Sequence, residues 1–254
     1  MQESKVIWRN IIQCISQGNS CIAGAGKHSC TIHIAGGDQM RIKWFGQSCF
    51  LIASESGVKI ITDPFDKKVG YRLPDVQPDI VTVSHEHMDH NNTKALEGNF
   101  VVFNKPVETE LQGVKIRGVE TCHDNAGGKK RGKNIVFIMI VDGIAICHLG
   151  DLGHILAEDQ VREIGEVDIL LLPVGGRFTI GAGDAATVKA QLQPVITIPM
   201  HYRTKAMGPF GLLLSKADSF LEMTPERKME LNELLVSKDN LAEKSGVLTL
   251  AYKH

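Results

Sequence analysis

The sequence of 254 residues predicts an α/β or α+β domain in which two β-sheets pack face to face and helices lie outside. Three observations support this fold class. The length suits one large domain, strand-like apolar runs dominate the first half, and strand and helix patterns alternate in the second half. Because sheets and helices must each bury an apolar face, packed sheets with outer helices satisfy both halves of this pattern.

The first half contains consecutive predicted strands, bounded by turn residues. They cover residues 41–52, 57–65, 79–85, 99–104 and 113–123. The run at 79–85 is almost continuously apolar, which is typical of a strand buried on both faces. Two further apolar runs flank Asp142-Gly143, a two-residue turn signal, and predict a hairpin over 134–151.

Helix and strand patterns alternate in the second half. The expected helices lie at 155–165, 184–193, 216–223 and 225–236. The expected strands lie at 167–176, 195–201 and 246–252. Gly165 supplies a stop for the first helix, and Asp184 opens the second.

Residues 1–39 lack this patterning and are expected to lie outside the domain, which is expected to cover residues 40–254. Polar Asn10 and Gln13 interrupt their apolar stretch, whereas a secretory signal needs a continuous apolar run of about 7–15 residues. The codons before Met40 can also encode a ribosome-binding site. We therefore expect residues 1–39 to be an extension that is not native or is weakly ordered.

Composition argues against several classes of protein. Apolar residues make up 43% and charged residues 22%, as in ordinary globular domains. A net charge of −1 gives no global attraction to nucleic acid or to an anionic membrane, so neither is an expected partner. No apolar run approaches the roughly 20 residues of a membrane span. The six cysteines form no CxxC pair, which favours reduced thiols in a cytoplasmic protein.

The most informative stretch is VTVSHEHMDHNN at residues 81–92. Here, three histidines and two acidic residues follow a buried strand. His85 and His87 are two residues apart, so an extended backbone directs both rings to one side. Asp89 and His90 come after the chain turns and can face a second point nearby. The stretch can therefore supply ligands to two neighbouring metal ions.

Three other predicted strands also end in a potential ligand. These are His123, Asp151 and His201. Loops converge at strand ends, and imidazole and carboxylate groups hold divalent cations such as Zn²⁺. One metal can take His85, His87 and His123, and a second can take Asp89, His90 and His201, with Asp151 bridging the two.

This ligand set leaves open positions for a shared water, as a hydrolytic two-metal centre requires. A hydroxide bridging two divalent metals would attack a carbonyl carbon or a phosphorus atom. Asp89 is the candidate catalytic residue, because it can orient the hydroxide and accept its proton. Zn²⁺ is the favoured cation, and Mn or Fe also suits a set of nitrogen and oxygen ligands.

The segment HEHMDH resembles the HxHxDH signature of the metallo-β-lactamase fold, and His123, Asp151 and His201 follow in the order of that family. The segment TDPF resembles the family's early aspartate motif, which implies that Asp63 lies beside the ligands and orients them. The resemblance covers residues 40–254 and is greatest to the bacterial metal-dependent hydrolases related to L-ascorbate-6-phosphate lactonase. It implies a four-layer αβ/βα sandwich, with a dinuclear site at one edge of two packed mixed sheets.

A basic, glycine-rich segment follows His123 and is a candidate for substrate binding. It contains the cations Lys129, Lys130 and Arg131. The segment can be a solvated hairpin loop, or it can be a flexible lip that attracts an anionic substrate.

Two more residues are candidates near the substrate. Arg177 lies in a second glycine-rich loop and can reach the mouth of the site or lie on the surface. His154 follows GDLG, where it can hold the loop or donate a proton to a leaving group. The predicted activity is hydrolysis of an ester, lactone or phosphoester bond in a small substrate, for which an anion is the favoured class. The sequence leaves open whether the protein forms oligomers.

Three other functions use the same fold or ligands. A nuclease that acts on RNA is disfavoured by the near-neutral charge and the short length, and a phosphodiesterase that acts on RNA or cyclic nucleotides is kept as an alternative. An iron-containing redox relative would use the same nitrogen and oxygen ligands. A metal-stabilised binding module is disfavoured because purely structural sites are closed.

Overall fold

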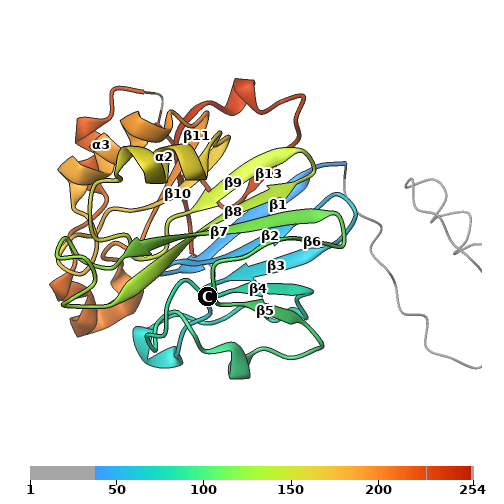
Figure 1. Ribbon diagram of the computed structural model, residues 1–254, viewed down its shortest axis with the longest axis horizontal. Helices are drawn as coiled ribbons and strands as arrows, with labels where there is room; N and C mark the ends of the chain where they lie inside the picture. The colour runs from blue at the N-terminus through green and yellow to red at the C-terminus, as the bar shows by residue number, and fades with distance from the viewer. Residues whose placement is uncertain (1–37, 227, 253–254) are drawn as a thin grey trace, which may run out of the picture.

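Two β-sheets packed face to face form the centre of the molecule in the computed structural model, which describes residues 38–226 and 228–252 (Figure 1). The predicted extension at 1–39 therefore lies almost entirely outside the described residues. No helix in the described ranges is long and apolar enough to span a membrane. The three cysteines in these ranges, Cys49, Cys122 and Cys147, are free thiols.

The first sheet has six strands in the order β13-β1-β2-β3-β4-β5. Their bounds are β1 (Met40–Gly46), β2 (Cys49–Ala53), β3 (Lys59–Thr62), β4 (Ile80–Thr82), β5 (Val101–Phe103) and β13 (Leu234–Val236). β3, β4 and β5 run parallel to one another, whereas the other neighbours are antiparallel. All three residues of β4 are buried, as expected for a strand in the interior of a sheet.

The second sheet has eight strands in the order β12-β14-β11-β10-β9-β8-β7-β6. Their bounds are β6 (Glu108–Leu111), β7 (Val114–Cys122), β8 (Lys133–Val141), β9 (Ile144–His148), β10 (Ile169–Pro173), β11 (Ile196–Met200), β12 (Lys228–Leu231) and β14 (Gly246–Leu250). β8 and β9 form the hairpin predicted around Asp142-Gly143. Because β8 is antiparallel to both β7 and β9, and β9, β10 and β11 are parallel, β7, β9 and β11 all run in one direction.

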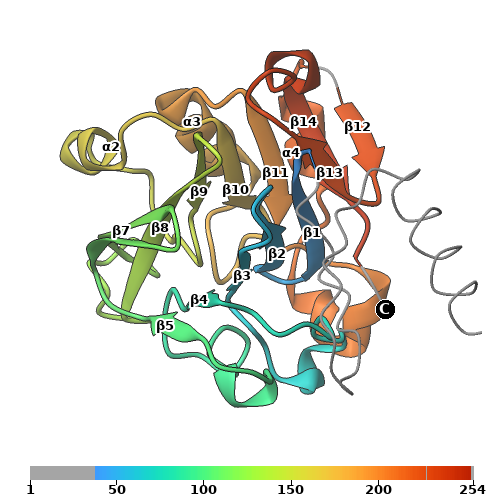
Figure 2. The same ribbon diagram turned by 90° about the vertical axis from the view of Figure 1, so that its right-hand side faces the viewer.

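Three apolar clusters define four layers. The first lies between the sheets and contains Trp44 and Phe50 from one sheet and Phe137 from the other. The second lies under α2 (Glu158–Ile164), α3 (Ala182–Leu192) and α4 (Asp218–Met223), which cover the outer face of the eight-stranded sheet (Figure 2). The third lies between the six-stranded sheet and short 3-10 segments that include η1 (Lys67–Val69) and η3 (Lys205–Leu213). The predicted sandwich of two mixed sheets is confirmed, and in the described ranges 3-10 turns supply its fourth layer.

The remaining 3-10 segments are η2 (Thr93–Ala95) and η4 (Ala242–Lys244). The prediction of a helix at 225–236 is wrong, because this segment contributes β12 and β13 to different sheets. In β12 the residues alternate between exposed and half-buried, which is the period of a strand. β12 extends the eight-stranded sheet by pairing with β14, so sheet pairing outweighs the local helical preference.

The single strand predicted over 41–52 is divided into β1 and β2 by a turn at Gly46-Gln47. Gln47 has φ of 49°, in the left-handed region that a strand residue does not adopt. The chain therefore reverses here, and the two strands pair with each other. The turn also brings Gln47 to the edge of the sandwich where Asp89 and His201 lie.

Candidate metal centre

Four strands end at one edge of the sandwich, and each leads into a predicted ligand. In the eight-stranded sheet, β7 is followed by His123, β9 leads to Asp151, and β11 is followed by His201. These strands run in the same direction, so their ends lie on the same edge. In the six-stranded sheet, β4 leads to His85, which begins the run of predicted ligands at 85–90. The site is thus assembled from both sheets.

Backbone contacts join the two sheets at this edge. The Ile135 N–H group donates to the Ser84 carbonyl at 2.9 Å, and the His201 N–H group donates to the Gln47 carbonyl at 3.1 Å. Gly150 lies where the loop after β9 passes Ser84. With φ of 56° and a hypothetical Cβ only 2.6 Å from the Ser84 Cβ, this position requires glycine. The close approach brings the loop that carries Asp151 against the one that begins with Ser84.

The structure brings all seven predicted metal ligands together. Their donor atoms form three groups in which all atoms lie within 4.8 Å of one another: His85, His87 and His123; Asp89, His90 and His201; and His85, His90 and Asp151. The first two groups are the two predicted ligand sets. The third group draws a histidine from each set and adds the aspartate between them.

Asp151 lies at the middle of this arrangement. Its Oδ2 atom is 3.3 Å from the Nε2 atoms of His90, His123 and His201. The same atom is 3.9 Å from Nε2 of His85. A carboxylate oxygen that contacts histidines of both sets is placed as a ligand shared by two cations would be.

The donor set fits a pair of divalent cations. The Nε2 atoms of His85 and His90 and the Oδ1 atom of Asp151 are buried and have no hydrogen-bond partner. Buried polar atoms without a partner are costly, and here they point to a bound ion. Because all the donors are nitrogen or oxygen, the set suits Zn²⁺, Mn²⁺ or Fe²⁺.

Asp63 is fully buried behind the histidines, bonds directly to His90 and reaches His85 through Ser84. Its Oδ2 atom accepts hydrogen bonds from Nδ1 of His90 at 2.8 Å and from the Ser84 hydroxyl at 2.6 Å, while its Oδ1 atom accepts from the Ser84 N–H group. The Ser84 hydroxyl in turn accepts from Nδ1 of His85 at 2.9 Å. Both rings therefore carry their proton on Nδ1 and turn the Nε2 lone pair toward the centre. Asp63 lies where the resemblance placed it.

Gln47 is a fully buried residue of the site that sequence reasoning missed. Its Nε2 atom donates to Oδ2 of Asp89 at 3.0 Å and lies 3.2 Å from Nε2 of His201, whereas its Oε1 atom is buried without a partner. Its backbone carbonyl accepts from the Trp44 indole N–H group at 2.9 Å and from the His201 amide. Gln47 follows a glycine and belongs to no recognisable sequence motif, so the sequence offered no signal that it is part of a site.

Asn134, at the start of β8, is a second residue that sequence reasoning missed. Its Nδ2 atom donates to Oγ1 of Thr121 at 2.8 Å and to the Leu149 carbonyl at 2.9 Å. Its Oδ1 atom accepts from the Asp151 N–H group at 2.9 Å. The amide thereby ties the ends of β7 and β9 together and fixes the backbone of Asp151.

Three residues of the site hold a left-handed backbone. The φ angles are 49° at Gln47, 39° at Asp63 and 51° at His201. Such a conformation costs a non-glycine residue about 1–3 kcal/mol, and it often persists where a site requires it. All three residues contact a predicted ligand or are one, so part of the backbone strain in the described structure lies at this centre.

The charges in the centre shift the pKa values of its members. Burial alone would raise the pKa of Asp151, but the neighbouring His201 and His90 hold it below the usual range. Burial and the adjacent His90 lower the pKa of His85 to about 3, so its ring is neutral at pH 7 and able to bind a metal. Burial opposes the charge on His90, yet Asp151 and Asp89 raise its pKa, so a proton there competes with a cation.

A cavity of about 300 Å³ opens beside the ligands. It is lined by His87, Asp89, His123, Lys130, Arg131, Asp151, Phe178, His201 and Phe210. Lys130 and Arg131 come from the predicted basic segment, and in the described part of the chain neither forms an ion pair with a carboxylate. The Arg131 guanidinium lies 5.5 Å from the centre of the Phe178 ring. The cavity wall thus combines two unpaired cations with two aromatic rings.

The basic segment is held in place by Asp124. The Asp124 carboxylate accepts hydrogen bonds from the backbone N–H groups of Ala126, Gly128, Lys130 and Arg131. Burial opposes the charge, but these four donors outweigh it and lower the pKa of Asp124 to about 2. The segment is therefore an ordered loop that presents two of its cations to the cavity.

Three residues predicted near the substrate do not line this cavity: Lys129, His154 and Arg177. Arg177 is exposed, and its guanidinium lies 5.8 Å from the Phe178 ring. His154 accepts a hydrogen bond from the Cys122 N–H group at 3.2 Å through Nε2 and donates from Nδ1 to the Ile155 carbonyl at 2.8 Å. Both ring nitrogens of His154 are engaged by backbone, which favours a structural role.

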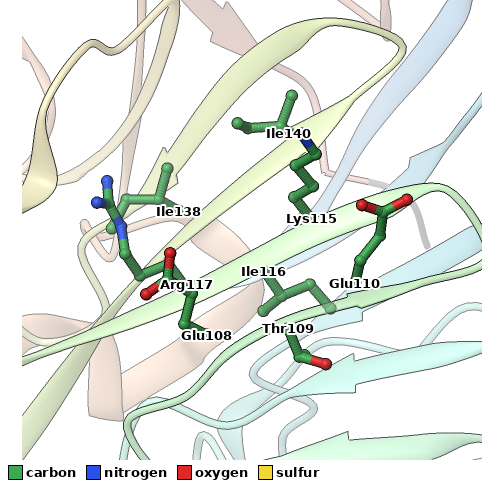
Figure 3. A pocket seen from close by; sticks show the side chains of 8 residues that line it. All are labelled: Glu108, Thr109, Glu110, Lys115, Ile116, Arg117, Ile138 and Ile140. Carbon is green, nitrogen blue, oxygen red and sulfur yellow. The ribbon is translucent and has the colours of Figure 1, made fainter.

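A separate hollow of about 350 Å³ lies along β6, β7 and β8 (Figure 3). It is lined by Glu108, Thr109, Glu110, Lys115, Ile116, Arg117, Ile138 and Ile140. None of these residues is a predicted ligand, and the Arg117 guanidinium donates to the Ile164 carbonyl at 2.7 Å. This hollow therefore shares no lining residue with the cavity beside the histidines.

Comparison with known proteins gives a consistent result. Residues 41–201 match the family model of the beta-lactamase superfamily domain. A UPF0173 metal-dependent hydrolase of Methanoculleus marisnigri is 30% identical over 78% of this chain and 94% of the relative. One from Methanosarcina mazei is 29% identical over 78% of this chain and 96% of the relative. A solved structure from Thermotoga maritima, described as a Zn-dependent hydrolase of the metallo-beta-lactamase superfamily, is 40% identical, with a TM-score of 0.71 over 84% of this chain and 100% of that one.

Proposed function

The chain belongs to the UPF0173 family of metal-dependent hydrolases in the metallo-β-lactamase superfamily, and on this premise we propose that it cleaves an ester, lactone or phosphoester bond at a centre of two divalent cations. The position of Asp151 carries the proposal, because its Oδ2 atom contacts the Nε2 atoms of both ligand sets. Zn²⁺ is the proposed cation, in keeping with the description of the Thermotoga maritima protein, and Mn or Fe is the alternative.

The residues around the cavity would share the chemistry. Bound divalent cations would supply Lewis acidity and lower the pKa of the water used for hydrolysis. Asp89 lines the cavity and is held by the Gln47 amide, so its carboxylate is placed to orient the water and accept its proton. Burial opposes ionisation of Asp89, but the neighbouring His90 and His201 lower its pKa, which keeps the carboxylate charged and able to orient the water by accepting its hydrogen bond.

The proposed substrate is a small anion. Lys130 and Arg131 would hold its negative group, since their charges are not neutralised by ion pairs with carboxylates of the described residues. Phe178 and Phe210 would contact its apolar part. A phosphorylated sugar lactone meets these requirements and is the substrate class that the resemblance to L-ascorbate-6-phosphate lactonase suggests. Lys129, Arg177 and His154 are given no direct contact in this proposal.

An activity screen on the zinc-loaded protein tests this function. Lactones, phosphodiesters and thioesters would be assayed, each with and without a phosphate group, and bound metal would be counted by elemental analysis of the same sample. We expect turnover of at least one class, greater kcat/KM for the phosphorylated member, and two metal ions per chain. Turnover that is unchanged in metal-free protein would contradict the proposal.

A further inference from the structure

We propose that Ser84 and Gln47 are positioning residues that support the two metal sites separately, so that each site can be weakened without the other. Ser84 would serve the set of His85, His87 and His123, and Gln47 would serve the set that contains Asp89 and His201. This inference rests on the proposed two-metal centre. Its physical basis is that the contacts of the two side chains with the ligands do not overlap.

Ser84 acts on one ligand set through a relay. Its hydroxyl donates to Oδ2 of Asp63 at 2.6 Å, so the oxygen lone pairs remain available to accept from Nδ1 of His85 at 2.9 Å. This chain of two hydrogen bonds fixes the tautomer and the rotation of the His85 ring. No side-chain hydrogen bond links Ser84 to Asp89, His90 or His201 in the described structure.

Gln47 acts on the other set. Its Nε2 atom donates to Oδ2 of Asp89 at 3.0 Å, and its backbone carbonyl accepts from the His201 N–H group at 3.1 Å. The amide orientation is determined by chemistry, because the reverse orientation would place Oε1 against the Asp89 carboxylate. When the Nε2 lone pair of His201 is taken by a cation, the Gln47 amide is left with Asp89 as its acceptor. Gln47 therefore orients the carboxylate and anchors the backbone of the histidine.

Asp63 is the support that the two sites share. It accepts directly from Nδ1 of His90, at 2.8 Å, and reaches His85 through Ser84. Loss of Ser84 should therefore weaken one site, loss of Gln47 the other, and loss of the Asp63 charge both. Removing an outer contact of this kind typically costs 10–100-fold in metal affinity.

Zinc titration of Ser84→Ala, Gln47→Ala and Asp63→Asn tests the proposal, with stoichiometry from native mass spectrometry and affinities from competition with a chelator. We expect Ser84→Ala and Gln47→Ala each to keep one site at the wild-type affinity and to bind the second ion about 10–100-fold more weakly. Asp63→Asn should weaken both. Ser84→Thr, which keeps the hydroxyl, should bind zinc at the first site with the wild-type affinity.

Imidazole NMR signals identify which site remains. At one equivalent of zinc, the His201 ring signals should shift in Ser84→Ala, and the His123 ring signals should shift in Gln47→Ala. Thr197→Val is the matched control, because the Thr197 hydroxyl is also fully buried but has no hydrogen-bond partner. This control should bind both ions normally, and thermal unfolding of each variant would show that it is folded.

The outcomes separate this inference from the function on which it rests. Two wild-type zinc sites that weaken equally in Ser84→Ala and in Gln47→Ala would overturn the inference and leave the two-metal function standing. Unchanged affinities in both variants would also overturn it. A wild-type protein that binds a single zinc ion would overturn the two-metal function and the inference together.

Discussion

Asp151 is the residue on which we expect the chemistry of the site to depend most, because it touches both ligand sets. Its Oδ2 atom lies 3.3–3.9 Å from four imidazole nitrogens, and Asn134 fixes its backbone. The isosteric change to asparagine keeps its volume and removes its charge. The two proposed cations would then lose the anion between them.

We predict that Asp151→Asn loses most of its bound metal and hydrolyses substrate at close to the background rate. Elemental analysis and steady-state kinetics measure the two effects, and circular dichroism shows whether the fold is kept. Asp142→Asn, in the β8–β9 hairpin turn, is the control and should retain both metal and activity. Full activity in metal-free Asp151→Asn would contradict the assignment.

His154, in contrast to Asp151, is expected to contribute to stability and not to catalysis. Because both of its ring nitrogens bond to backbone groups, His154→Ala should lower the free energy of unfolding by about 1 kcal/mol per lost hydrogen bond. Turnover per folded molecule should change only a few-fold. Denaturant unfolding and kinetics measure these quantities. A large loss of kcat at unchanged stability would instead assign His154 a role in proton transfer.

The ligands and Asp63 could be proposed from the sequence, but the other supports of the ligands could not. His85, His87, Asp89 and His90 have a spacing that itself predicts chemistry, whatever the rest of the fold does. Gln47, Ser84 and Asn134 are neutral polar residues with no such spacing. The role of Gln47, for example, becomes visible only when the β1–β2 turn is placed against the end of β11, which is a contact between residues 154 positions apart.

At the scale of elements, the loop after β7 shows how a flexible composition can still give fixed geometry. Its glycines suggested a mobile lip, yet the four N–H groups that point to Asp124 hold it in one shape. The helix predicted over β12 and β13 is wrong for a related reason. These strands form because they pair with β14 and β1, and local periodicity carries no information about that pairing.

We predict that Asp124→Ala loosens this loop and weakens binding of an anionic substrate. Hydrogen exchange at the amides of residues 126–131 should become faster, and KM should rise more than kcat falls, because Lys130 and Arg131 lose their fixed positions. Asp79→Ala is the control, since Asp79 accepts a single backbone N–H group, from Lys59, in another loop. Unchanged exchange at residues 126–131 would contradict the prediction.

The stabilisation of this loop by Asp124 should depend on pH. The pKa of Asp124 is about 2 in the folded protein and near 3.9 in an unfolded chain, so the folded state favours the charged form. The stabilisation is therefore fully present above about pH 4 and is lost as the pH falls toward 2. Hydrogen exchange of the loop, measured relative to the Asp124→Ala variant, should converge with that variant at low pH.

At the scale of the whole molecule, the metal centre lies where the two sheets meet. His85 to His90 extend from the six-stranded sheet, while His123, Asp151 and His201 extend from the eight-stranded sheet. Cations that bind residues from both sheets would hold the halves of the sandwich together. Because such ligands stabilise only the folded state, metal binding and folding are linked.

We predict that chelation lowers the melting temperature by about 5–10 °C for each cation removed, which corresponds to about 2.7 kcal/mol per site at a metal concentration of 100 times Kd. Adding zinc back should restore it. Differential scanning calorimetry measures the shift, and Asp151→Asn should show a much smaller response to the chelator. Equal melting temperatures with and without metal would show that the cations do not connect the sheets.

Trp44 gives this edge of the sandwich an optical reporter. Its indole N–H group bonds to the Gln47 carbonyl that also accepts from His201, and its ring centre lies 5.0 Å from that of Tyr202. The sequence contains one other tryptophan, Trp8, which Trp8→Phe would silence. In that variant, the fluorescence emission of Trp44 should respond when an ion occupies the site of His201 and should be much less sensitive to the site of His123. Occupancy of one position could then be followed in real time, without labels or substrate.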